Sequence, residues 1–69
     1  MLNLSNVKNN MKNARFHKKL TLDDISLATG IWQAKLSRIE RGIFVATQDE
    51  KKKISKVLDS KIAEIFPDA

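Results

Sequence analysis

Apolar residues along this chain recur three or four positions apart, the spacing of one helix face. A first helix is predicted over residues 6–17, with Ser5 as a candidate N-cap. Three apolar residues share one face of this helix: Val7, Met11 and Ala14. A second helix is predicted over residues 22–28, with Thr21 as its capping residue and two aspartates in its first turn. Gly30 follows it, well placed for a left-handed C-terminal cap.

Three further helices are predicted in the second half of the chain. The first covers residues 33–41 and ends at Gly42, and the next begins at a capping box formed by Thr47 and Glu50. A last short helix is stopped by Pro67. The residues expected to face inward are Leu36 and Ile39, then Ile54, Val57 and Leu58, then Ile62, Ile65 and Phe66. Only residues 43–45 show even weak strand alternation, so the predicted fold is all-α, with five short helices around one core.

Composition narrows the function classes. Sixty-nine residues make one small domain, expected to span residues 1–69 with a core at about 4–66. With no cysteine and one histidine, we expect no metal site, no cofactor and no enzyme activity. No apolar run could span a membrane and the N-terminus lacks the plan of a signal peptide, so a cytoplasmic protein is expected. The net charge of +5 suits a polyanionic partner and equally suits a solubilising surface.

Two charged residues stand on the edges of apolar stripes. Arg15 follows Met11 by four residues, and Glu40 follows Leu36 by four. Both side chains are therefore drawn towards the core, where neither charge is tolerated alone. We predict that Arg15 and Glu40 form a structural ion pair.

Residues 15–42 carry a recognisable arrangement. Arg15 is followed by Leu20-Thr21, two aspartates, the Gly30-Ile31 turn, and then Leu36-Ser37-Arg38-Ile39-Glu40-Arg41-Gly42. This pattern resembles the Cro and phage-repressor type of helix-turn-helix, often called the XRE family. The resemblance covers about residues 4–66, because residues 54–58 and 62–67 also look like that family's fourth and fifth helices.

The resemblance implies a lambda-repressor-like domain that binds double-stranded DNA and regulates transcription, with repression the expected mode. The setting it implies is a bacterium, a phage or a plasmid. The helix over residues 33–41 would enter the major groove, where Gln33, Ala34 and Arg38 reach base edges. The chemistry agrees, since Gln pairs with adenine, Arg with guanine, and Ala contacts a thymine methyl. It also implies that the matching Arg and Glu pair.

A second group of residues is expected to contact DNA phosphates instead of bases. It comprises Trp32, Lys35, Ser37, Arg41, Lys18 and Lys19. Trp32 stands where the family usually has a capping Ser or Thr, so the start of this helix departs from the pattern. Leu22 stands where many members have a Gln that contacts the DNA backbone, and that contact cannot exist here. We expect the lysines at 51, 52, 53 and 56 to form a solvated face, with approach of Lys51 to a phosphate as the alternative.

The apolar loop Ile43-Phe44-Val45-Ala46 also departs from the usual polar loop. We expect one or two of its three large residues to be buried and at least one to be exposed beside the DNA-facing surface. Phe44 is the residue favoured for exposure. Phe44 would then contact a neighbouring subunit. The resemblance places further homodimer contacts near Ile62 and Ile65.

Two other functions stay open. One is a protein-interaction module of the antitoxin or anti-repressor kind, which would dock a protein partner through residues 43–46. The other is an RNA binder, although three Phe and one Trp form no visible stacking platform.

Overall fold

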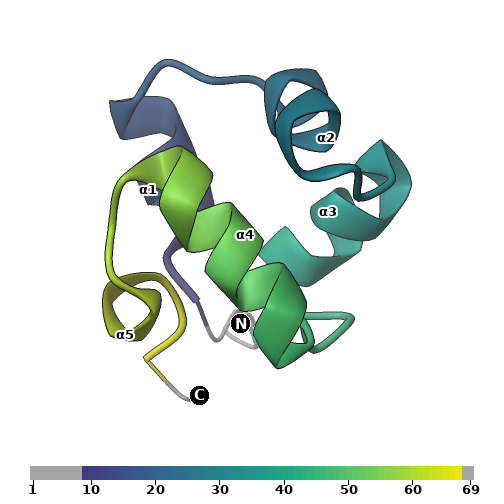
Figure 1. Ribbon diagram of the computed structural model, residues 1–69. Coiled ribbons are helices and arrows are strands. Elements are labelled where there is room, and N and C mark those ends of the chain that lie inside the picture. Colours follow the sequence, from purple (N-terminus) through teal and green to yellow (C-terminus); the bar gives the residue numbers. More distant parts are fainter. Residues whose placement is uncertain (1–8, 68–69) are drawn as a thin grey trace, which may run out of the picture.

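The computed structural model describes residues 9–67, which form five helices and no strand (Figure 1). The helices are α1 (Met11–His17), α2 (Leu22–Thr29), α3 (Gln33–Glu40), α4 (Gln48–Leu58) and α5 (Ile62–Ile65). The predicted all-α fold is therefore confirmed. α2 packs against both α3 and α4, while α5 lies against α4 on the side away from α2 and α3.

One core joins all five helices. Its buried apolar side chains are Met11, Ile25, Ile31, Leu36, Ile39, Ala46, Ile54, Leu58, Ile65 and Phe66. Burying a side chain of the size of Leu or Ile stabilises a fold by about 1.5–3 kcal/mol. The predicted inward residues are thus largely confirmed, while Val57 and Ile62 are only partly buried at its margin.

Two helices begin at capping boxes. The Thr47 hydroxyl accepts a hydrogen bond from the backbone N–H of Glu50 (3.1 Å), and the Glu50 carboxylate accepts one from the N–H of Thr47 (2.9 Å). Thr21 and Asp24 make the same reciprocal pair at the start of α2 (3.1 and 2.8 Å). Both predicted caps are confirmed, because such a cap depends only on residues within one turn of each other.

The start of α1 differs from the prediction. The helix begins at Met11 with Asn10 as its N-cap, so a start at Asn6 is wrong at least for residues 9 and 10; Ser5 and Val7 lie outside the described residues. Asn10 instead bonds to α5, donating from its backbone N–H to the Ile65 carbonyl (2.7 Å) and from its side chain to the Glu64 carbonyl (2.9 Å).

The loop after α3 corrects a second expectation. Ile43, Phe44 and Val45 are all exposed, at 59%, 44% and 86%, and only Ala46 is buried. The predicted exposure of Phe44 is confirmed. The prediction that one or two of these three residues are buried is wrong. Gly42 turns the chain at φ +80°, and the backbone N–H groups of Ile43 and Phe44 both point back to the carbonyl of Arg38. This turn directs the loop away from the core.

Lys51 corrects a third expectation. Three of the four clustered lysines are exposed, but Lys51 is buried, with its ammonium 5.7 Å from the centre of the Phe66 ring. A lysine stem can cover apolar surface in this way while its amine stays near the edge of the core. Lys51 therefore belongs to the contact between α4 and α5 and not to a solvated face.

Candidate nucleic-acid interface

The turn between α2 and α3 is tightly fixed. Gly30 adopts a left-handed conformation at φ +78°, as expected for a residue that ends a helix. The Ser26 hydroxyl donates to the Ile31 carbonyl (2.6 Å), and the Ile31 N–H donates to the Thr29 hydroxyl (3.2 Å). The Ile31 side chain is itself buried. Local hydrogen bonds and one apolar anchor therefore set the angle between the two helices.

α3 has one buried face and one outward face. Leu36, Ile39 and Glu40 are buried, whereas Ser37 and Lys35 are partly exposed. The outward face of α3 and its C-cap carry four exposed residues: Gln33, Ala34, Arg38 and Arg41. On a helix of 3.6 residues per turn these four and Ser37 lie within one continuous arc. The structure thus brings together all three residues predicted to contact bases, with Arg41 as the residue that follows α3 directly.

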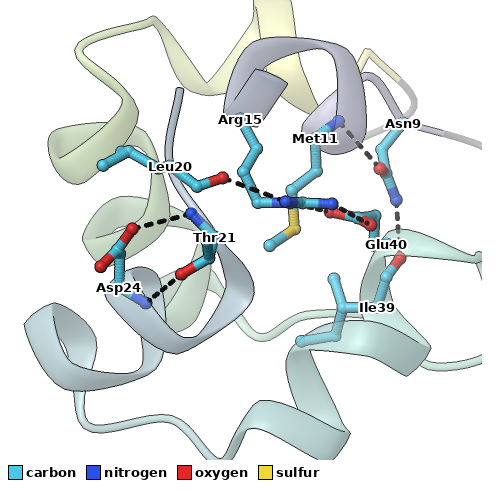
Figure 2. A network of polar contacts seen from close by, with 8 residues as sticks. All are labelled: Asn9, Met11, Arg15, Leu20, Thr21, Asp24, Ile39 and Glu40. Carbon is cyan, nitrogen blue, oxygen red and sulfur yellow. Dashed lines mark hydrogen bonds and ion pairs between the residues drawn. The ribbon is translucent and has the colours of Figure 1, made fainter. Parts of the chain in front are cut away.

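The predicted ion pair between Arg15 and Glu40 is present (Figure 2). The Arg15 guanidinium donates to both carboxylate oxygens, through Nε (2.9 Å) and an Nη atom (3.2 Å), and to the Leu20 carbonyl (3.0 Å). Both residues are buried, at 8% and 7% exposure. The Phe16 ring lies 4.7 Å from the guanidinium carbon. The pair therefore joins α1 to the end of α3 and faces the core rather than the outward arc.

A second connection to α3 lies beside this pair. The Asn9 side chain donates to the Ile39 carbonyl (2.8 Å) and accepts from the N–H of Met11 (3.1 Å), as Figure 2 shows. Sequence reasoning did not single out Asn9, because it placed this residue inside the first helix, whereas α1 begins at Met11. With the Arg15–Glu40 pair, it fixes the carboxyl-terminal end of α3.

The first turn of α3 is held from another side. The Lys35 ammonium lies 2.6 Å from a carboxylate oxygen of Glu50 in α4. This ammonium and the Thr47 backbone N–H hold the pKa of Glu50 below its ordinary value. Glu50 was predicted only as a capping residue, and a pair fifteen positions apart has no local sequence signal. Glu50 therefore offsets the charge of Lys35, a residue predicted to contact a phosphate.

Arg38 and Phe44 also lie together. The guanidinium carbon of Arg38 is 5.6 Å from the centre of the Phe44 ring, within the range of a cation–π contact. The two residues were singled out separately, one as a base contact and the other as a partner contact. The structure places them in one surface cluster at the end of α3.

The other predicted phosphate contacts are dispersed. Lys18 and Lys19 are exposed in the turn that leads into α2, and Lys19 has a left-handed backbone at φ +58°. Lys18 lies 3.5 Å from the exposed carboxylate of Asp59. Such an exposed pair contributes little energy and yields readily to a stronger anion.

Trp32 is 82% exposed at the N-cap of α3, where its side chain makes no capping hydrogen bond. This is the expected consequence of a residue without a capping acceptor at this position. Its indole N–H is a donor of the kind that binds phosphate oxygens.

The predicted dimer contacts divide into two kinds. Ile62 is partly exposed, but Ile65 is only 1% exposed within the core. The assignment of Ile65 as a partner contact is therefore corrected, because its side chain is fully used by the fold of its own chain.

Across residues 9–67, no three His, Cys, Asp or Glu side chains gather into a group that could hold a metal ion. No helix in this part of the chain has the length and apolar character needed to cross a membrane. Comparisons with protein-family models, with curated proteins and with solved structures found no match.

Proposed function

We propose that this protein binds double-stranded DNA in a sequence-specific manner, with α3 in the major groove and α2 across the sugar–phosphate backbone. The observation that carries the proposal is the outward arc of α3. Gln33, Ala34 and Arg38 are exposed there together, opposite a buried apolar face. Their side chains match adenine, thymine and guanine edges respectively.

The anchoring of α3 supports the proposal. The Arg15–Glu40 pair and Asn9 hold one end of the helix, and the Lys35–Glu50 pair holds the other. A helix that reads bases needs a fixed orientation, because hydrogen-bond recognition fails when the donors are displaced.

Phosphate contacts are assigned to the cations and neutral hydrogen-bond donors around this arc. Arg41 is exposed at the end of α3, while Trp32, Lys35 and Ser37 lie near its start or along its edge. Lys18 and Lys19 supply positive charge ahead of α2, whose own first turn carries Asp23 and Asp24. These contacts would set affinity and register but would not read sequence.

The role that fits this activity best is transcriptional regulation by repression in a bacterial, phage or plasmid cytoplasm. Its support is the resemblance of residues 15–42 to phage-repressor proteins. A homodimer on DNA completes the proposal, since one small domain makes few phosphate contacts and paired half-sites double them.

The decisive experiment is selection of bound sequences from a pool of random DNA duplexes, with Arg38→Ala selected in parallel. We expect a defined consensus from the native protein and a loss of information at a guanine position in the variant. A labelled duplex is then challenged with unlabelled duplex DNA or RNA. No enrichment of any sequence, or equal competition by RNA, would contradict the proposal.

A protein-interaction module is the second candidate. It is favoured by the exposure of Ile43, Phe44 and Val45, three consecutive large apolar side chains on a small surface. This function predicts that Ile43→Ser and Val45→Ser abolish a stoichiometric protein complex while the selection from random duplexes yields no consensus.

A further inference from the structure

The loop after α3 folds back onto a single residue of that helix. The backbone N–H groups of Ile43 and Phe44 lie 2.8 and 3.3 Å from the Arg38 carbonyl oxygen, and the Phe44 ring lies under the Arg38 guanidinium. Gly42 permits this return with its left-handed backbone. The same loop therefore contacts both the main chain and the side chain of Arg38.

This contact lies at the surface and outside the core. Phe44 is 44% exposed and takes no part in the buried apolar cluster, although it is large enough to fill such a cluster. The only cation found over this ring among the described residues is Arg38.

The physical effect of such a contact is to restrict the arginine. A free arginine side chain samples many rotamers and must lose that freedom when it binds. A ring beside the guanidinium attracts it and so limits those rotamers, while the guanidinium N–H groups stay available. Those N–H groups are the donors that reach O6 and N7 of guanine.

We propose that Phe44 is a positioning residue that orients Arg38 for guanine recognition and so determines the specificity of the interface. This proposal rests on the proposed function. Phe44 acts through Arg38 and need not contact DNA. The other cation of α3 and the one that follows the helix both differ. Lys35 is held by Glu50, and Arg41 has no ring over it among the described contacts.

The test compares Phe44→Leu, which keeps apolar bulk but removes the ring, with Phe44→Tyr, which keeps the ring. Leu27→Ala is the matched control, since Leu27 is an exposed apolar residue outside this loop. Affinity is measured for a selected duplex and for the same duplex with its guanine replaced. This guanine is identified with Arg38→Ala. It is the position at which replacing the guanine lowers the affinity of the native protein but not that of the variant.

We expect Phe44→Leu to lower the ratio of the two affinities about two- to fivefold, the effect of one exposed cation–π contact. Phe44→Tyr and Leu27→Ala should keep the native ratio. In the Arg38→Ala background, Phe44→Leu should change nothing further, because the residue on which it acts is absent. Melting temperatures should stay close to native in all of these variants.

Nitrogen-15 relaxation at Nε of Arg38 in the free protein separates the failure of this proposal from that of DNA binding. The side chain should be more ordered in the native protein and Phe44→Tyr than in Phe44→Leu. Equal order in all three, or an equal loss of affinity for both duplexes, would overturn the positioning role even if DNA binding holds. Ordered Arg38 in a protein that selects no duplex would instead overturn the proposed function, and the guanine assignment with it.

Discussion

The guanidinium of Arg15 forms two hydrogen bonds with the carboxylate of Glu40, across the boundary between α1 and the end of α3. A third hydrogen bond, to the Leu20 carbonyl, uses a further donor of the same group. Because both residues are buried, each charge depends on the other. The pair thereby links the orientation of α3 to the stability of the whole domain.

Glu40→Ala should lower the free energy of unfolding by about 3 kcal/mol or more, because it leaves a buried guanidinium without its partner. A domain of this size has a total of roughly 3–10 kcal/mol, so the variant should lose about a third or more of its stability. Urea denaturation followed by circular dichroism measures the loss.

Two further variants keep this prediction testable if Glu40→Ala does not fold. Glu40→Gln retains a hydrogen-bond acceptor and should lose less stability than Glu40→Ala. Replacing both residues with apolar ones, as in Arg15→Met with Glu40→Leu, should also cost less than Glu40→Ala. Equal stability of Glu40→Ala and the native protein would show that the pair contributes nothing.

The features that sequence reasoning predicted correctly are those with short-range signals. Thr21 and Thr47 cap helices through residues three positions away, and the Arg15–Glu40 pair follows from two stripes that each predict burial. The features it missed depend on tertiary contacts. The Lys35–Glu50 pair and the burial of Lys51 depend on where α4 packs, which no local pattern encodes.

The loop over residues 43–46 shows the same limit. Apolar composition alone favours burial, and the expected burial of one or two large residues followed from it. The structure exposes all three because Gly42 and the Arg38 carbonyl direct the backbone outward, while the core is already filled by other residues. A hydrophobic pattern predicts which residues can be buried but not whether the fold has room for them.

Acid should destabilise the native protein more than it destabilises the Lys35→Met variant. The pKa of Glu50 is lowered first by Lys35 and then by the Thr47 backbone, from an ordinary value of 4.5. A carboxyl group whose folded pKa is depressed stabilises the fold above its unfolded pKa, and this contribution is lost as pH falls through the folded pKa. The native protein should therefore lose more stability between neutral pH and about pH 3 than Lys35→Met does.

The comparison within this acid titration isolates Glu50 from Asp24. The Thr21 backbone N–H also holds the pKa of Asp24 below its ordinary value, so both carboxyl groups act in the same pH window. Lys35→Met changes only the surroundings of Glu50, and Asp24 contributes equally to both proteins. Parallel stability curves would show that the Lys35–Glu50 pair has no energetic role.

Arg38→Ala and Arg41→Ala should affect DNA binding differently. Loss of a bidentate base contact at Arg38 should cost about 1–3 kcal/mol on the selected duplex and little on a scrambled one. Loss of a phosphate contact at Arg41 should weaken both duplexes alike and reduce the slope of log K against log salt by about 0.9. Identical, sequence-independent effects from both variants would mean that neither residue reads a base.

Lys35→Ala should reduce the same salt slope by less than Arg41→Ala, because Glu50 already neutralises Lys35 in the free protein. Conversely, Glu50→Gln should increase affinity for selected and scrambled duplexes alike by releasing the ammonium. Binding is measured by fluorescence anisotropy over a series of salt concentrations. If Lys35→Ala instead lowered the slope of log K against log salt as much as Arg41→Ala, DNA would displace Glu50 from Lys35 completely.

Two copies of the protein should bind a duplex that carries two half-sites one helical turn, about 34 Å, apart. The exposed loop is the surface through which we expect them to assist each other, and Val45 is its most exposed residue. Because an 86% exposed side chain contributes little to folding, Val45→Ser should keep the native melting temperature. Val45→Ser should also keep the native affinity for a single half-site while reducing the cooperativity with which the second copy binds.

Leu27→Ser, which alters an exposed apolar residue on α2, should leave that cooperativity unchanged. Sedimentation of the protein–duplex complex gives the stoichiometry, and a single copy bound with nanomolar affinity to the paired site would rule out the dimer.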